Sequence, residues 1–162
     1  MHDFAAKAVI AEFSRGNYSA MYVTGGPLEM GAPLSEYKNY AQLGAAILEK
    51  FGMATNKLQA VPAPEVRKDR TYVSALALKG WLEAHGGVPP SLNVVSVGPH
   101  ARRTRLLFER AFGSQTQIGI IAVEDPNYDA RHWWKSSQGF RTVFDESVAY
   151  LYARFLFKPE KG

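Results

Sequence analysis

Short apolar runs of strand length alternate along the chain with longer segments of helical period. Runs rich in Val, Ile and Leu predict strands, and apolar positions three or four residues apart predict helices. The predicted strands cover residues 19–24, 57–61, 92–97 and 117–123. The predicted helices lie within residues 3–15, from a cap at Ser35 to a stop at Gly52, and over about 69–84, 100–112 and 139–157.

This alternation is typical of βαβ units, which form a mostly parallel sheet covered by helices on both faces. We therefore predict a three-layer, Rossmann-like α/β fold with a sheet of about four strands. No repeat, low-complexity stretch or linker divides the chain, so a single domain over residues 1–162 is expected. Ligands of such folds bind beyond the carboxyl ends of the strands, where this sequence places its polar clusters.

The strongest cluster follows the third predicted strand, where His100 and Arg103 begin a helix. Helical residues are about 100° apart, so both share the stripe that enters the core at Leu107, whereas Arg102 and Arg105 lie on the opposite, solvated face. A helix N-terminus attracts anions through its free N–H groups. We predict that His100 and Arg103 face a ligand. The alternative is a plain helix-end histidine beside an arginine that pairs with a structural carboxylate.

Candidate ligand-binding residues also lie at the end of the first predicted strand and at the start of the helix that follows the second one. These are Thr24, Gly25, Gly26, Arg70, Thr71 and Ser74. The two glycines would let a ligand approach bare backbone N–H groups. Asp69 is the predicted cap of the helix that carries Thr71 and Ser74, whose hydroxyls either bind ligand oxygens or bond back to their own helix.

Several familiar chemistries lack support. The sequence has no phosphate loop, dinucleotide fingerprint or Gly-x-Ser-x-Gly elbow, so it implies no particular cofactor. An acidic loop holds Glu124, Asp125, Asp129 and His132, which raises a hard-metal site as an alternative. Acidic loops after strands are common and no paired-histidine motif accompanies this one, so no metal site is predicted.

Charge and composition narrow the partners further. The net charge is +4, and the basic excess lies within residues 61–110. A nucleic-acid binder would more often show a long basic stripe with aromatics, so we predict a local pocket for an anionic small molecule and no nucleic acid. No apolar run approaches the roughly 20 residues of a membrane span, and the N-terminus lacks signal-peptide features. The chain has no cysteine, which hints at the cytoplasm, and a cytoplasmic location is expected.

The order of these motifs resembles the YdcF/SanA/ElyC-type family of bacterial proteins, whose function is largely unassigned. The resemblance covers residues 11–157 and rests on "TGG", "SE", "KFGM", "DRTYVSA" and "VGPHARR". It implies a Rossmann-like domain in which His100 and Arg103 match a family His and the Arg three residues later. Thr24, Gly25 and Gly26 match the family's turn, Glu36 its helix-opening glutamate, and Thr71 the threonine of a Thr-x-Glu-Asn-Ala-like motif.

Two departures accompany the resemblance. Val73 and Ser74 stand where the family has Glu and Asn, which argues against acid–base chemistry from that helix. The family also opens with an apolar strand and a Gly-rich turn, so we expect this chain to be truncated at its N-terminus relative to the family. The lack of an internal strand would expose a sheet edge and favour a homo-oligomer.

Two functional hypotheses follow. In the first, the protein is an enzyme acting on a phosphorylated or otherwise anionic metabolite, with Arg103 holding the anion, His100 as general acid or base, and Glu36 as its partner carboxylate. In the second, the same residues form a non-catalytic module that binds a nucleotide-like ligand or an envelope precursor. The resemblance implies a connection with bacterial envelope and peptidoglycan maintenance, and some members of the family are membrane-anchored.

Overall fold

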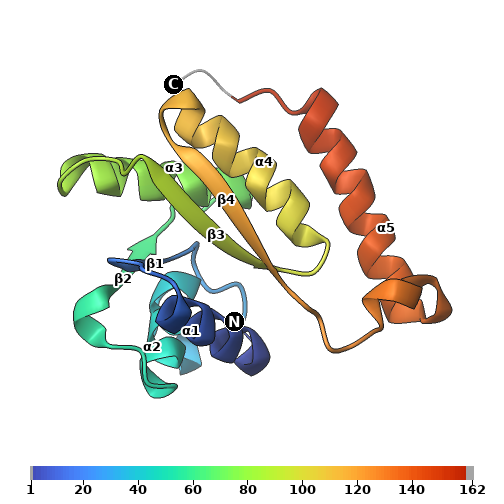
Figure 1. Cartoon of the computed structure of the whole chain (residues 1–162), viewed down its shortest axis with the longest axis horizontal. Coiled ribbons are helices and arrows are strands. Elements are labelled where there is room, and N and C mark those ends of the chain that lie inside the picture. Colours follow the sequence, from blue (N-terminus) through green and yellow to red (C-terminus); the bar gives the residue numbers. More distant parts are fainter. Residues whose placement is uncertain (1, 160–162) are drawn as a thin grey trace. The chain divides into compact units, whose positions relative to one another are not determined.

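The structure is a computed structural model that describes residues 2–159. The chain forms two compact units, Met1–Val88 and Pro89–Gly162. Each unit contains one pair of parallel strands together with its own helices (Figure 1).

The first unit is built around strands β1 (Met21–Gly25) and β2 (Leu58–Pro62), which pair in parallel from Met21↔Leu58 to Gly25↔Pro62. Its helices are α1 (Asp3–Arg15), α2 (Tyr40–Lys50) and α3 (Arg70–Ala84), with short 3-10 turns at Ala32–Leu34 and Thr55–Lys57.

Helices α2 and α3 cover opposite faces of this strand pair. Neighbouring side chains of a strand point to opposite faces. Val23 approaches α2 so closely that a Cβ at Gly44 would lie 2.8 Å from its Cγ1, whereas the ring of Tyr22 lies 5.4 Å from that of Trp81 on α3. The buried side chains of the two helices are Ala41, Ala45, Leu48, Ala75, Leu78 and Leu82. The expected helix–sheet–helix layering is thus present in this unit.

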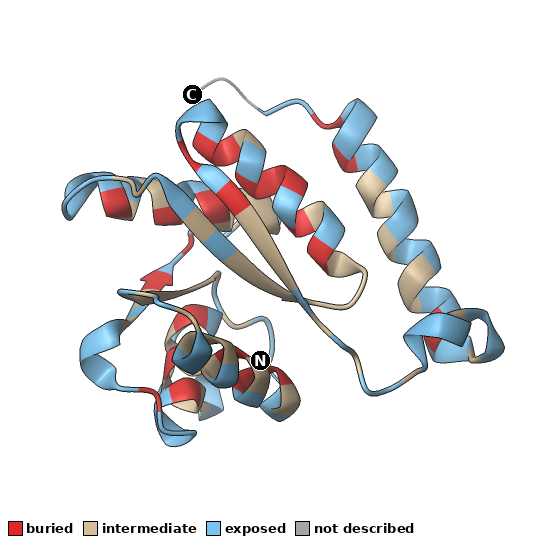
Figure 2. Ribbon diagram, in the orientation of Figure 1, coloured by how far each residue is buried: buried red, intermediate tan, exposed pale blue. Residues whose placement is uncertain are grey.

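The second unit is built around β3 (Ser91–Val97) and β4 (Gln117–Val123), which pair in parallel from Ser91↔Gln117 to Val97↔Val123. Helix α4 (His100–Phe112) lies along this pair and buries one side against it (Figures 1 and 2). The chain continues through 3-10 turns at Gly113–Gln115 and Ala130–Lys135 into α5 (Ser137–Leu151), which ends in a π-helical turn at Tyr152–Leu156.

The predicted α/β class is confirmed, since all four strands form and pair in parallel. They pair as two separate ladders, one in each unit, rather than as one hydrogen-bonded sheet of four. The single domain over residues 1–162 stays a prediction, and residues 1 and 160–162 of it lie outside the described part. Within residues 2–159, no helix is both long and apolar enough to cross a membrane.

Three predicted helix starts are corrected or refined. Helix α2 is capped by Asn39 rather than Ser35, because the Asn39 Oδ1 accepts the Gln42 N–H at 2.9 Å. Asp69 does precede α3, but it has a φ of +60° and its side chain makes no capping bond. Helix α5 begins two residues earlier than expected, because Ser136 caps it by accepting the Gly139 N–H.

Candidate functional site

The turn from β3 into α4 positions His100 and Arg103. Gly98 adopts a φ of +53°, which favours glycine, and its N–H donates to the Val123 carbonyl at the end of β4. Pro99 is helical at φ −66° and precedes the first residue of α4, His100. Residues three apart in a helix are neighbours on its surface. The side chains of His100 and Arg103 therefore emerge together.

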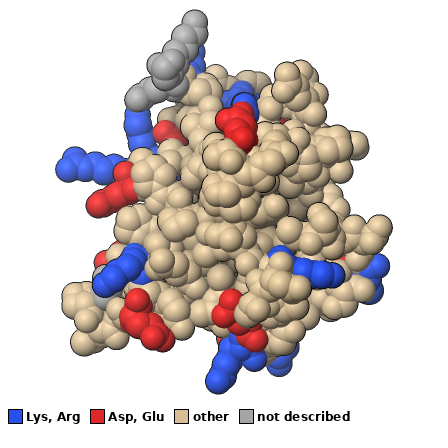
Figure 3. Space-filling model, turned by 90° about the vertical axis from the view of Figure 1, so that its left-hand side faces the viewer, with Lys and Arg blue, Asp and Glu red and all other residues tan. Residues whose placement is uncertain are grey.

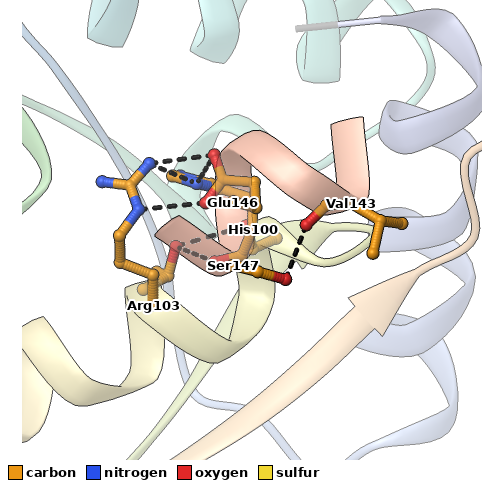
Figure 4. A network of polar contacts seen from close by, with 7 residues as sticks. His100, Arg103, Val143, Glu146 and Ser147 are labelled. Carbon is orange, nitrogen blue, oxygen red and sulfur yellow. Dashed lines mark hydrogen bonds and ion pairs between the residues drawn. The ribbon is translucent and has the colours of Figure 1, made fainter. Parts of the chain in front are cut away.

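Both side chains contact Glu146 of α5 (Figure 4). The Arg103 Nε donates to one carboxylate oxygen and Nη2 to the other, each at 3.0 Å, which is the two-point geometry favoured by arginine and carboxylate. The His100 Nδ1 lies 3.0 Å from the Glu146 Oε1 and 2.9 Å from the Arg103 Nη2. We refer to these three residues as the His–Arg–Glu cluster.

The cluster holds Glu146 as a carboxylate. Its side chain is only 20% exposed, and this burial by itself would raise its pKa. Hydrogen bonds from His100 and Arg103, together with their positive charge, outweigh burial and lower the pKa of Glu146 to about 2. The negative charge of Glu146 is therefore present at neutral pH and neutralises Arg103.

The two contacts of the His100 Nδ1 favour opposite tautomers. Glu146 only accepts hydrogen bonds, so its Oε1 at 3.0 Å favours a proton on Nδ1, whereas the Arg103 Nη2 at 2.9 Å only donates and favours a lone pair there. Within residues 2–159, no group is hydrogen-bonded to Nε2, and the side chain is 37% exposed. The Nε2 side of the imidazole ring is therefore the side that a ligand could reach.

A buried hydroxyl fixes the base of the cluster. Thr104 is buried on the inner side of α4, and its hydroxyl donates to the His100 carbonyl at 3.0 Å. The Ser96 hydroxyl of β3 lies 3.4 Å from the Thr104 hydroxyl oxygen. The predicted entry of this stripe into the core at Leu107 is confirmed, since Leu107 is buried together with Thr104 and Ala111.

The N-terminus of α4 is less open to an anion than expected. The Ala101 N–H donates to the Gly98 carbonyl at 3.2 Å, and the Arg102 N–H donates to the Pro99 carbonyl at 3.4 Å. Proline has no N–H. Two N–H groups of the first turn therefore already have backbone partners, which leaves fewer donors for an anion.

An open groove of about 590 Å³ lies beside α4 in the second unit. It is lined by Gly98, Pro99, Ala101, Arg102, Arg105, Leu106, Glu109, Ile120, Ala122, Tyr150 and Arg154. The guanidinium group of Arg102 lies 4.5 Å from the centre of the Tyr150 ring. Arg105 and Glu109, one helical turn apart, form an ion pair at 2.8 Å. Arg102 and Arg105 are exposed as predicted, but they also line this groove.

The predicted "TGG" turn has a structural explanation. A Cβ at Gly25 would lie 2.7 Å from the Tyr40 Cβ, so only glycine lets the end of β1 pack against α2. The Gly25 carbonyl accepts from the Ala63 N–H, and the Gly26 carbonyl from the Tyr40 N–H. Thr24 is half-buried and pairs with Val61 in the ladder.

The other candidates of the first unit lie in the first turns of α3 and in the loop before α2. Arg70 is exposed and forms an ion pair with Glu29. Thr71 and Ser74 are half-buried in the first turns of α3. Glu36 is exposed, and its hydrogen bond to Tyr37 raises the pKa of that phenol.

Glu146, not Glu36, is the carboxylate in contact with His100. Glu146 was missed because it lies 46 residues from His100 in the sequence and no motif spacing links the two. The available signal was weak: Glu146 and Tyr150 are one turn apart, on the polar side of a helix whose other side is apolar.

The acidic loop serves local structure. The Asp129 carboxylate accepts from the Arg131 N–H at 2.8 Å and contacts the His132 Nδ1 at 2.7 Å, and its pKa is lowered chiefly by His132. Asp125 accepts from Asn127. No group of three or more metal-ligating side chains occurs within residues 2–159.

On the face drawn in Figure 3, basic and acidic side chains are interspersed without a continuous basic stripe.

No protein-family model, curated protein or solved structure matches the chain. Membership of the YdcF-type family therefore stays a prediction that rests on the motifs alone.

Proposed function

We propose that the protein binds an anionic small molecule, phosphorylated or nucleotide-like, in the groove beside the N-terminal end of α4. The observation that carries this proposal is the set of three arginines in the groove, which only Glu109 opposes. Within residues 2–159, neither Arg102 nor Arg154 has a carboxylate partner. Their guanidinium groups remain available to an anion.

This assignment moves the anion from Arg103 to its neighbours. The Nε and Nη2 groups of Arg103 already donate hydrogen bonds to Glu146. An anion bound at Arg103 would therefore be repelled by the negative charge of Glu146. Arg102 is instead held over the Tyr150 ring, an arrangement that leaves its N–H donors free.

The remaining lining indicates the rest of the ligand. Leu106, Ile120 and Ala122 give the groove apolar walls, and Tyr150 adds an aromatic ring. Such a surface suits a molecule that carries an apolar or flat part beside its charged group. The resemblance to the YdcF-type family supports a ligand from bacterial envelope-related metabolism.

The His–Arg–Glu cluster favours a second candidate function, an enzyme that uses acid–base catalysis. Glu146 and Arg103 hold the imidazole through Nδ1, which leaves Nε2 to exchange a proton with a ligand. The alternative remains a module that binds without turnover.

Binding is tested by thermal shift with a panel of phosphorylated metabolites and nucleotides. A ligand at about 100 times its Kd should stabilise the protein by about 2.7 kcal/mol. The double variant Arg102→Gln, Arg154→Gln should lose this shift. The control Arg67→Gln, Arg141→Gln removes the same charge from exposed arginines outside the groove and should keep it. A shift that survives in the groove variant would contradict the proposal.

Catalysis is tested on whichever compound binds. Pro99 and Ala101 line the groove but His100 does not, so the reacting group of a substrate would have to extend past the first turn of α4 to reach the imidazole. His100→Gln should then abolish conversion followed by mass spectrometry, while the thermal shift given by Arg102 and Arg154 is retained. If a ligand binds through Arg102 and Arg154 but the wild type never converts it, the result would support the non-catalytic binding module. Affinity for any DNA duplex that falls steeply with salt would favour nucleic-acid binding instead.

A further inference from the structure

The last helix carries an exposed apolar face. Thirteen large apolar side chains are exposed within residues 2–159, and seven of them belong to α5 and its π-helical end. These are Phe140, Phe144, Val148, Leu151, Tyr152, Phe155 and Leu156. Figure 2 shows α5 as exposed or intermediate over most of its length, in contrast to α4.

This face lies on the side of α5 that points away from α4. At about 100° per residue, Phe140, Phe144, Val148 and Leu151 fall within one narrow stripe. Glu146 and Tyr150 lie on the other side, where they contact His100, Arg103 and Arg102. Helix α5 therefore turns its charged Glu146 toward α4 and its phenylalanines toward solvent, which is the reverse of the usual arrangement in an amphipathic surface helix.

The seven-residue face is large enough for a stable interface. Phe140, Phe144 and Phe155 are 50%, 57% and 73% exposed. Since an aromatic side chain offers about 200 Å², the seven residues together expose about 700 Å². Two such faces would bury about 1,400 Å², within the range of about 1,200–2,000 Å² for specific interfaces.

We propose that this face pairs with a second copy of the chain, α5 against α5, in an antiparallel two-fold dimer. The seven apolar residues are centred on Val148 in the sequence, and the exposed Arg141 and Asp145 lie at the Tyr152 side of the face. A two-fold axis near Val148 would place Phe144 opposite Tyr152 and Phe140 opposite Leu156 of the second copy. A face that presents similar apolar residues on both sides of its midpoint is self-complementary, as a two-fold interface requires. The dimer does not depend on the proposed ligand.

Sedimentation equilibrium tests the proposal at several protein concentrations. The wild type should approach twice the chain mass of 17.9 kDa. Phe144→Glu should sediment as a folded monomer, because two glutamates would be buried in the interface. Leu76→Glu is the matched control, since Leu76 is 42% exposed on α3, and it should remain dimeric. Circular dichroism establishes that both variants are folded.

A cross-link tests the position of the axis independently. The natural chain has no cysteine, so Val148→Cys introduces the only thiol. Near a two-fold axis this thiol would meet its own copy, and an added oxidant should give a covalent dimer; Leu76→Cys should not. A monomeric wild type, an unchanged mass for Phe144→Glu, or equal cross-linking of both cysteines would overturn the proposal. So would a monomer that binds anionic lipid vesicles through Phe144, because a membrane would then be the partner.

Discussion

Replacing Glu146 with glutamine removes the charge at the centre of the His–Arg–Glu cluster while keeping its shape. The pKa of Glu146 is lowered from an ordinary 4.5 to about 2, and this difference corresponds to about 3 kcal/mol of stability from its ionised form. The side chain is only 20% exposed, so solvent screens little of this energy. We expect Glu146→Gln to destabilise the second unit by about 2–3 kcal/mol at pH 7.

The effect should depend on pH with a definite sign. The pKa of Glu146 is lower in the folded state, so its contribution is fully present above pH 4.5 and is lost as the pH falls through about 2. The difference in unfolding free energy between wild type and Glu146→Gln should therefore shrink between these two values. Other acidic groups titrate in both proteins and cancel in that difference.

Urea unfolding followed by tryptophan fluorescence measures this difference. Of the three tryptophans, Trp133 and Trp134 lie in the second unit, so a Trp81→Phe background limits the signal to that unit. With a slope of about 2 kcal/mol per molar urea, the midpoint at pH 7 should fall by about 1–1.5 M.

Glu109→Gln is the matched control for this experiment. Glu109 also pairs with an arginine, but its side chain is 44% exposed, and such a pair contributes less than about 0.5 kcal/mol. Equal effects of the two substitutions, or a Glu146 effect that persists at pH 2, would refute the argument that partial burial gives the cluster its strength.

Two further predictions concern the first unit. Gly25→Ala should destabilise it by about 1–3 kcal/mol, because the new Cβ would lie 2.7 Å from the Tyr40 Cβ. Gly26→Ala, whose Cβ meets nothing closer than 3.7 Å, is the control, and equal midpoints in urea would contradict this packing. Asn39→Ala should lower the unfolding free energy by about 1 kcal/mol, because the Gln42 N–H loses its capping hydrogen bond. An unchanged melting temperature would show that Asn39 is not the residue that caps α2.

The elements of local period were predictable because their signals are local. Helix α4 begins and ends where its apolar spacing predicts, and β4 coincides with its apolar run. The start of α2 was not predictable in the same way. Both Ser35 and Asn39 are good caps, and the choice of Asn39 goes with a bridge between Pro27 and Asn39 that closes the preceding loop.

The candidate site divides along the same line. The helical phase of α4 follows from the chain itself, so it already separated His100 and Arg103 from Arg102 and Arg105. Which groups those side chains meet depends on how α5 packs against α4, and no local rule encodes that packing. Tertiary structure alone brought Glu146 to His100 and Arg103 and Tyr150 to Arg102. The sequence by itself therefore determined which residues share a face, and the packing of two helices decided which charges are neutralised and which stay available to a ligand.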